Sequence, residues 1–210
     1  MTIWPLETIS NVIQMLALLV LVVFLWFRAD KTKRPMVVKF YTFGLFSYFM
    51  GDLFWALYQL LLNEAPDGFS ASDLVWLGSF CIFTGIIQML GVDNMKQPWW
   101  VWAVPAIVVA NAVSWDLLWS DNYINNGLWG VVLTIYAWYI AAGFNSAGKA
   151  MKPYYISNAT MLLVDLIMFQ SWGIVYTIMN FVMTANMIVM PLLLLRCIER
   201  DADDREGAEQ

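Results

Sequence analysis

The chain has 210 residues, of which 61% are hydrophobic and only 13% are charged, and its formal net charge is −5. A soluble domain usually has about 25% charged residues, and the mean hydropathy of +0.64 is typical of a chain dominated by long apolar segments. Because the chain contains no histidine, imidazole metal sites, histidine-ligated haem and histidine-based catalytic triads are excluded.

Seven apolar segments follow one another, each about as long as a hydrocarbon core of ~30 Å requires. They predict an all-α integral membrane protein, with a bundle of seven transmembrane helices forming a single domain over residues 1–200. The expected helices cover residues 8–28, 37–62, 73–91, 99–119, 125–144, 154–171 and 174–196. The sixth segment is the shortest, so an arrangement with six spans is the alternative. Residues 201–210 are polar and acidic, which predicts a disordered tail.

Lysine and arginine are confined to one side of the predicted bundle. They lie after the first, third, fifth and seventh segments and at the segment ends that adjoin these places. The connections on the other side contain no lysine or arginine, and two of them contain the acidic residues Glu64, Asp67 and Asp121. By the positive-inside rule, the N-terminus is expected outside and the C-terminus in the cytoplasm, in a plasma or inner membrane.

Two segments share a pattern that suggests an internal repeat. Lys39 and Asp52 are 13 residues apart in the second segment, and Lys152 and Asp165 are 13 residues apart in the sixth. This match favours a parallel 3+1+3 repeat as a hypothesis. The topology resembles that of the sugar-transporting SWEET family and the related vitamin carriers. The resemblance covers topology alone, because the proline tetrad and PQ-type motifs of those families are absent, so no family is assigned.

Asp52 and Asp165 are the only carboxylates that lie clearly within the predicted spans. A carboxylate at that depth costs at least ~2.5 kcal/mol, so it requires a partner, water, a proton or a cation. The basic residues lie at the ends of the spans, so none is near enough in depth to neutralise either one. Both are expected in the outer half, since 13 helical residues rise ~20 Å from the inner boundary. Asp73 and Asp116 are expected at outer helix ends, in contact with water.

The two intramembrane aspartates are expected to face one cavity that opens outward and to hold one proton or one cation between them. Tyr48, Asp52 and Trp55 are spaced i, i+4 and i+7, so they share one face of their helix. The remaining candidates for the lining are Asn11, Gln14 and Asn180. The alternative for the polar candidates is hydrogen bonding between helices, which is worth about 0.6 kcal/mol on average.

No HExxH, GxSxG, phosphate-binding glycine loop or CxxC motif occurs, so no catalytic residue, metal or cofactor is predicted and an enzyme is not favoured. The sequence favours a small-molecule membrane carrier or binding protein with a cationic ligand. One alternative is a seven-helix receptor or sensor that signals to a cytoplasmic partner, and another is an integral-membrane enzyme that modifies lipid. The expected partners are the lipid bilayer and a small molecule, with no nucleic acid, and homo-oligomerisation is left open.

Overall fold

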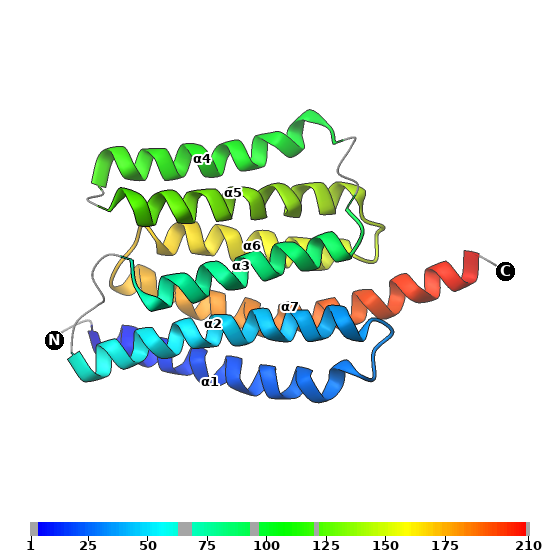
Figure 1. Ribbon diagram of the computed structural model, residues 1–210, viewed down its shortest axis with the longest axis horizontal. Helices are drawn as coiled ribbons and strands as arrows, with labels where there is room; N and C mark the ends of the chain where they lie inside the picture. The colour runs from blue at the N-terminus through cyan, green and yellow to red at the C-terminus, as the bar shows by residue number, and fades with distance from the viewer. Residues whose placement is uncertain (1–3, 63–68, 93–96, 120–121, 209–210) are drawn as a thin grey trace.

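The computed structural model describes residues 4–62, 69–92, 97–119 and 122–208 (Figure 1). These residues form seven α-helices, and no strand occurs among them. The helices are α1 (Trp4–Ala29), α2 (Pro35–Leu62), α3 (Ala71–Met89), α4 (Trp99–Trp119), α5 (Tyr123–Ser146), α6 (Lys152–Met168) and α7 (Ile174–Ala208).

Six of the helices in the described part of the chain are long and apolar enough to cross a membrane. The exception is α6, whose 17 residues span ~26 Å, slightly less than a hydrocarbon core of ~30 Å. Large apolar side chains face outward from the bundle, among them Val20 and Phe27, which are 68% and 74% exposed. An apolar outer surface of this kind is suited to lipid, and we conclude that the chain is a helical membrane protein.

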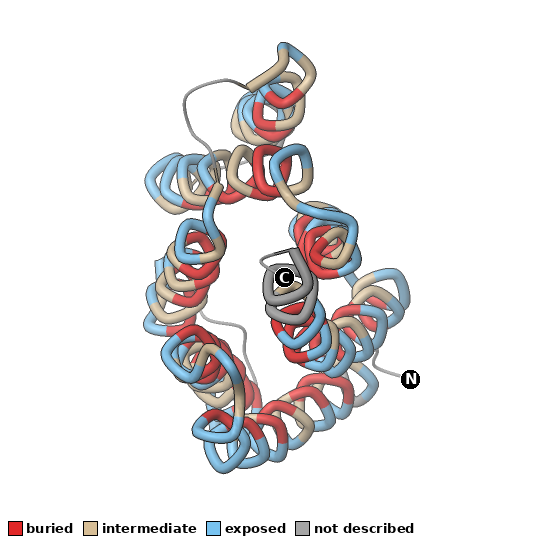
Figure 2. The backbone as a smooth tube through the Cα atoms, turned by 90° about the vertical axis from the view of Figure 1, so that its right-hand side faces the viewer, coloured by how far each residue is buried: buried red, intermediate tan, exposed pale blue. Residues whose placement is uncertain are grey.

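Six of the helices form a closed ring (Figures 1 and 2). Around the ring, α1 packs on α2, α2 on α3, α3 on α5, α5 on α6, α6 on α7, and α7 again on α1. The remaining helix, α4, packs chiefly on α5 and lies outside the ring. Viewed end-on in Figure 2, the buried positions of the ring helices face their neighbours and the interior.

Small residues on α2 allow α3 to approach closely. A Cβ atom added at Gly44 would lie 3.0 Å from Cδ1 of Phe83, and one added at Gly51 would lie 2.8 Å from Cε2 of Trp76. Between them, the Ser47 hydroxyl donates a hydrogen bond to the Val75 carbonyl at 2.6 Å. This contact follows the small-residue pattern by which membrane helices pack, and it fixes where the α3 side chains stand relative to α2.

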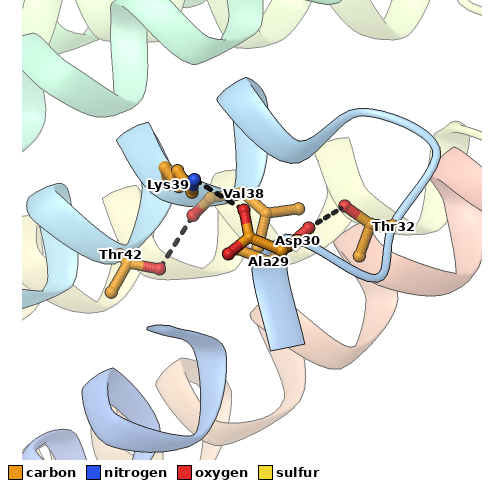
Figure 3. A network of polar contacts seen from close by, with 6 residues as sticks. All are labelled: Ala29, Asp30, Thr32, Val38, Lys39 and Thr42. Carbon is orange, nitrogen blue, oxygen red and sulfur yellow. Dashed lines mark hydrogen bonds and ion pairs between the residues drawn. The ribbon is translucent and has the colours of Figure 1, made fainter. Parts of the chain in front are cut away.

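Polar contacts stabilise the connection between the end of α1 and the start of α2 (Figure 3). The Lys39 ammonium lies 2.6 Å from a carboxylate oxygen of Asp30, and the Thr32 hydroxyl donates to the Ala29 carbonyl at 2.7 Å. The last carbonyl groups of α1 are therefore partly satisfied by the turn that follows it.

Helix α7 is longer than the sequence predicts. Its backbone is helical through Ala208, in the segment 201–210 for which the sequence predicts a disordered tail, and residues 209–210 lie outside the described residues. Two ion pairs hold the start of this extension against the α1–α2 connection. Arg28 lies 3.8 Å from Glu199, and Arg34 lies 3.3 Å from Asp201. Of the two acidic residues, Asp201 belongs to the segment 201–210 for which disorder is predicted, and Glu199 lies just before it.

Candidate functional site

A cavity of about 370 Å³ lies at the end of the bundle where α1, α3, α5 and α7 begin and α2 and α6 end. All six ring helices contribute to its wall, α4 does not, and no described lysine or arginine lines it. The lining consists of Glu7, Asn11, Gln14, Tyr48, Asp52, Trp55, Gln59, Asp73, Trp76, Asn125, Trp129, Asp165, Met168, Phe169, Ser171, Trp172 and Tyr176. The wall therefore combines carboxylates, amides and aromatic rings.

The structure brings six of the seven predicted residues to this cavity. They are Asn11, Gln14, Tyr48, Asp52, Trp55 and Asp165. The seventh, Asn180, does not line it. Asn180 is fully buried between helices, where its side-chain amide donates to Oγ of Ser10 at 3.0 Å and to Oδ1 of Asn11 at 2.8 Å. Asn180 thus joins α7 to α1 and stabilises the position of Asn11, which lines the cavity.

The two intramembrane aspartates project into the cavity from helices that are not neighbours in the ring. Asp52 is 4% exposed and Asp165 is 6% exposed. Oδ1 of Asp52 accepts a hydrogen bond from the indole Nε1 of Trp76 at 3.1 Å. Oδ2 of each aspartate is buried and has no hydrogen-bond partner among the described residues. Buried polar atoms are nearly always paired, so each of these carboxylates still lacks one hydrogen-bond donor.

Asp73 is buried, which corrects the expectation that it contacts water. Its carboxylate accepts from the Ser70 backbone N–H at 2.9 Å and from the Trp129 indole at 3.1 Å. The first bond belongs to the capping box at the start of α3, and the second ties α3 to α5. Asp73 therefore has a structural role in the wall, because both of its oxygens are already engaged. Asp116, the other expected surface aspartate, accepts from the amide of Asn126 at 2.9 Å.

Glu7 forms part of the rim and was not predicted. Its Oε1 accepts the backbone N–H of Gly173 at 2.7 Å, just before α7 begins. Gly173 has a φ of 66°, a left-handed conformation that glycine adopts without steric cost. This turn explains why α6 ends at Met168, three residues before the predicted boundary at 171.

Aromatic side chains form much of the wall between these polar groups. The ring centroids of Trp55 and Trp76 are 5.8 Å apart, those of Tyr48 and Trp76 are 6.2 Å apart, and those of Trp129 and Phe169 are 4.7 Å apart. Nε1 of Trp55 is buried without a partner in the described structure. Aromatic faces attract cations, so these rings and the aspartates favour the same kind of ligand.

Trp76 and Trp129 were not predicted to line the cavity, because tryptophan near helix ends normally marks the membrane interface. Each indole N–H instead binds an aspartate on a neighbouring helix. Only the packing of α2, α3 and α5 brings those partners together. Among the described residues, no group of three or more histidine, cysteine, aspartate or glutamate side chains could hold a metal ion.

No protein-family model, curated protein or solved structure matches the chain, so its function is argued from the cavity alone.

Proposed function

We propose that the protein is a small-molecule membrane carrier or binding protein whose outward-facing cavity holds a small organic cation. One observation carries this proposal. Asp52 and Asp165 both line a cavity whose described wall contains no lysine or arginine, and each has a buried carboxylate oxygen without a hydrogen-bond partner among the described residues. Removing a carboxylate from water without compensation is costly, and a bound cation would supply the missing charge and hydrogen bonds.

We also propose that the chain crosses the membrane seven times, with the N-terminus outside. The partition of lysine and arginine between the two ends of the helices supports this orientation. Helix α6 runs along the bundle between α5 and α7, which supports counting it as a span despite its length. In this orientation the cavity lies at the acidic outer end.

The neighbour relations support the parallel 3+1+3 repeat. The contact of α1 with α2 corresponds to that of α5 with α6, and the contact of α2 with α3 corresponds to that of α6 with α7. The contact of α1 with α7 corresponds to that of α5 with α3, and α4 stands outside the ring as the linker of such a repeat would. In this scheme Asp52 and Asp165 are equivalent positions, which accounts for one carboxylate from each half.

A receptor or sensor is the second candidate, favoured by the continuity of α7. This single helix lines the cavity at Tyr176 and forms ion pairs at the opposite end of the bundle through Glu199 and Asp201. A ligand that moves α7 would therefore also move the opposite end of this helix, where Glu199 and Asp201 form their ion pairs. Between the two ends, side chains such as Tyr41, Tyr154 and Phe83 are fully buried, so a carrier must rearrange this layer to release its ligand inward.

The binding test uses the purified full-length protein, 2-phenylethylamine as a cationic probe and 2-phenylethanol as its neutral counterpart, measured by isothermal titration calorimetry. We expect the amine to bind and Asp52→Asn and Asp165→Asn each to weaken it by about tenfold or more, which corresponds to loss of one charged hydrogen bond. Asp30→Asn is the matched control, because it removes a carboxylate at the other end of the bundle. Equal affinity in all variants, or no preference for the amine, refutes the proposal.

Uptake of the labelled amine into proteoliposomes separates the two candidates. Uptake that Asp165→Asn abolishes supports a carrier, whereas binding without uptake supports a receptor.

The orientation is tested by cysteine labelling with an impermeant thiol reagent on intact cells, in a background where Cys81 and Cys197 are replaced by alanine. We expect a cysteine at Ser70 to react directly and a cysteine at Lys149 to react only after permeabilisation. The reverse pattern contradicts the proposed orientation.

A further inference from the structure

We propose that the ligand is a protonated primary or secondary amine that also carries an uncharged hydrogen-bond acceptor, as an amino alcohol does. This inference rests on the proposed cation-binding function and specifies its ligand class. It depends on the side-chain atoms of lining residues that are buried without a described partner, which are Oδ2 of Asp52, Oδ2 of Asp165, Oδ1 of Asn125 and Nε1 of Trp55. The three oxygens, including that of Asn125, accept hydrogen bonds, and the indole nitrogen donates one.

The two aspartate oxygens require hydrogen-bond donors as well as positive charge. At Asp52, the Trp76 indole already occupies Oδ1, and Oδ2 is left to the ligand. A quaternary ammonium ion presents only methyl groups, so it would leave both Oδ2 atoms buried without a hydrogen bond. A primary or secondary ammonium presents N–H groups and forms the shorter, stronger bonds that carboxylates make with charged donors.

The Trp55 indole requires the opposite kind of partner. An indole nitrogen can only donate, so the ligand must supply an acceptor near Nε1 of Trp55. A carboxylate on the ligand would meet a wall that contains Glu7, Asp52, Asp73 and Asp165 and no described basic side chain. The acceptor is therefore uncharged, and a hydroxyl group satisfies this requirement. The acidic wall therefore favours an amino alcohol over an amino acid.

Aromatic side chains of the cavity wall provide a surface for the apolar part of the ligand. Trp76, Trp129 and Phe169 present aromatic surface within the same cavity. The cavity volume of about 370 Å³ is at the lower end of the range for small-molecule sites. A compound with one aromatic ring, one amine and one hydroxyl group is therefore a suitable probe, and phenylalaninol has these three groups.

The experiment compares four related compounds by calorimetry on the purified full-length protein near neutral pH. They are phenylalaninol, its N,N,N-trimethyl derivative, phenylalanine and 3-phenylpropan-1-ol. We expect phenylalaninol to bind and the other three to bind more weakly by about tenfold or more. If the trimethyl derivative binds as tightly as phenylalaninol, the requirement for N–H donors is refuted while cation binding stands. If phenylalanine binds as tightly, the requirement for an uncharged acceptor is refuted. If neither cation binds, the proposed function fails, and this inference fails with it.

A tryptophan variant tests the acceptor separately. Trp55→Phe removes the indole N–H and keeps an aromatic ring, so we expect about fivefold weaker binding of phenylalaninol and little change for 2-phenylethylamine, which has no hydroxyl group. The matched control is Trp26→Phe, since Trp26 lies on the outer surface with 52% exposure and lines no part of the cavity. An equal effect on both ligands, or no effect on either, refutes the pairing of the ligand acceptor with Trp55.

Discussion

The contact between Gly51 and Trp76 provides a sharp test of how the cavity is built. Gly51 precedes Asp52 on α2, and the Trp76 indole lies directly over it while donating to Asp52. A Cβ atom at position 51 would lie 2.8 Å from Cε2 of Trp76 and closer still to Cδ1 and Nε1. Real Cβ atoms essentially never approach other atoms this closely, so in Gly51→Ala the indole must move.

Two costs follow from that movement. Overpacking of a tight contact destabilises a protein by about 1–3 kcal/mol. Loss of the indole hydrogen bond leaves Oδ1 of Asp52 buried without a donor, which costs a further ~1–3 kcal/mol. We therefore expect Gly51→Ala to lower the free energy of unfolding by about 2–6 kcal/mol and also to weaken amine binding, because Asp52 loses the partner that orients it.

The assay is reversible unfolding in detergent micelles, followed by circular dichroism, with amine binding measured on the folded fraction. Gly85→Ala is the matched control, because a Cβ atom added at that position on α3 meets no atom within 4 Å. We expect the control to be neutral or to stabilise by about 0.5–1 kcal/mol through helix propensity. If Gly51→Ala unfolds like the control and binds the amine normally, the proposed packing of Trp76 against α2 is incorrect.

The remaining predictions concern two residues that stabilise the helices around the cavity and one ion pair at the opposite end of the bundle. Glu7→Gln is expected to lower stability by about 1 kcal/mol, measured by thermal unfolding, because its charged bond to the Gly173 N–H is weakened. Asn180→Ala should cost about 1–2 kcal/mol through its two bonds to α1 but should change amine affinity far less than Asp165→Asn; the opposite ranking contradicts the structure. Arg34→Ala is expected to cost at most about 1 kcal/mol, since its pair with Asp201 is partly exposed, and added salt should reduce the difference.

The helices themselves were largely predictable from the sequence. Apolar segments of sufficient length define the spans, and the predicted bounds of the fourth helix, 99–119, agree with α4. The deviations coincide with features of the tertiary structure. α6 ends before a left-handed turn at Gly173 that Glu7 stabilises, and ion pairs with Arg28 and Arg34 hold the start of the α7 extension. Both features involve contacts between residues more than 160 positions apart, which hydropathy does not report.

The sequence predicted six residues that line the cavity, but it also predicted Asn180, which does not. Helical spacing correctly placed Tyr48, Asp52 and Trp55 on one face, and Gln59 continues that face into the cavity. Helical spacing did not show that Asn180 lies outside the cavity, since a polar residue in a span can also form hydrogen bonds with a neighbouring helix. Depth in the membrane can be inferred from sequence, whereas the choice between cavity and helix interface depends on which helices are neighbours.

The ring of helices explains why two distant carboxylates meet at one cavity. α2 and α6 are separated by two helices on either side of the ring, so Asp52 and Asp165 face each other across its interior. Neither aspartate can neutralise the other, and no described lysine or arginine is within the wall to do so. The fold thus retains two buried acceptors that packing alone would not favour. Each unsatisfied group costs about 1–3 kcal/mol, and the proposed cationic ligand, bound between the two aspartates, would offset this cost.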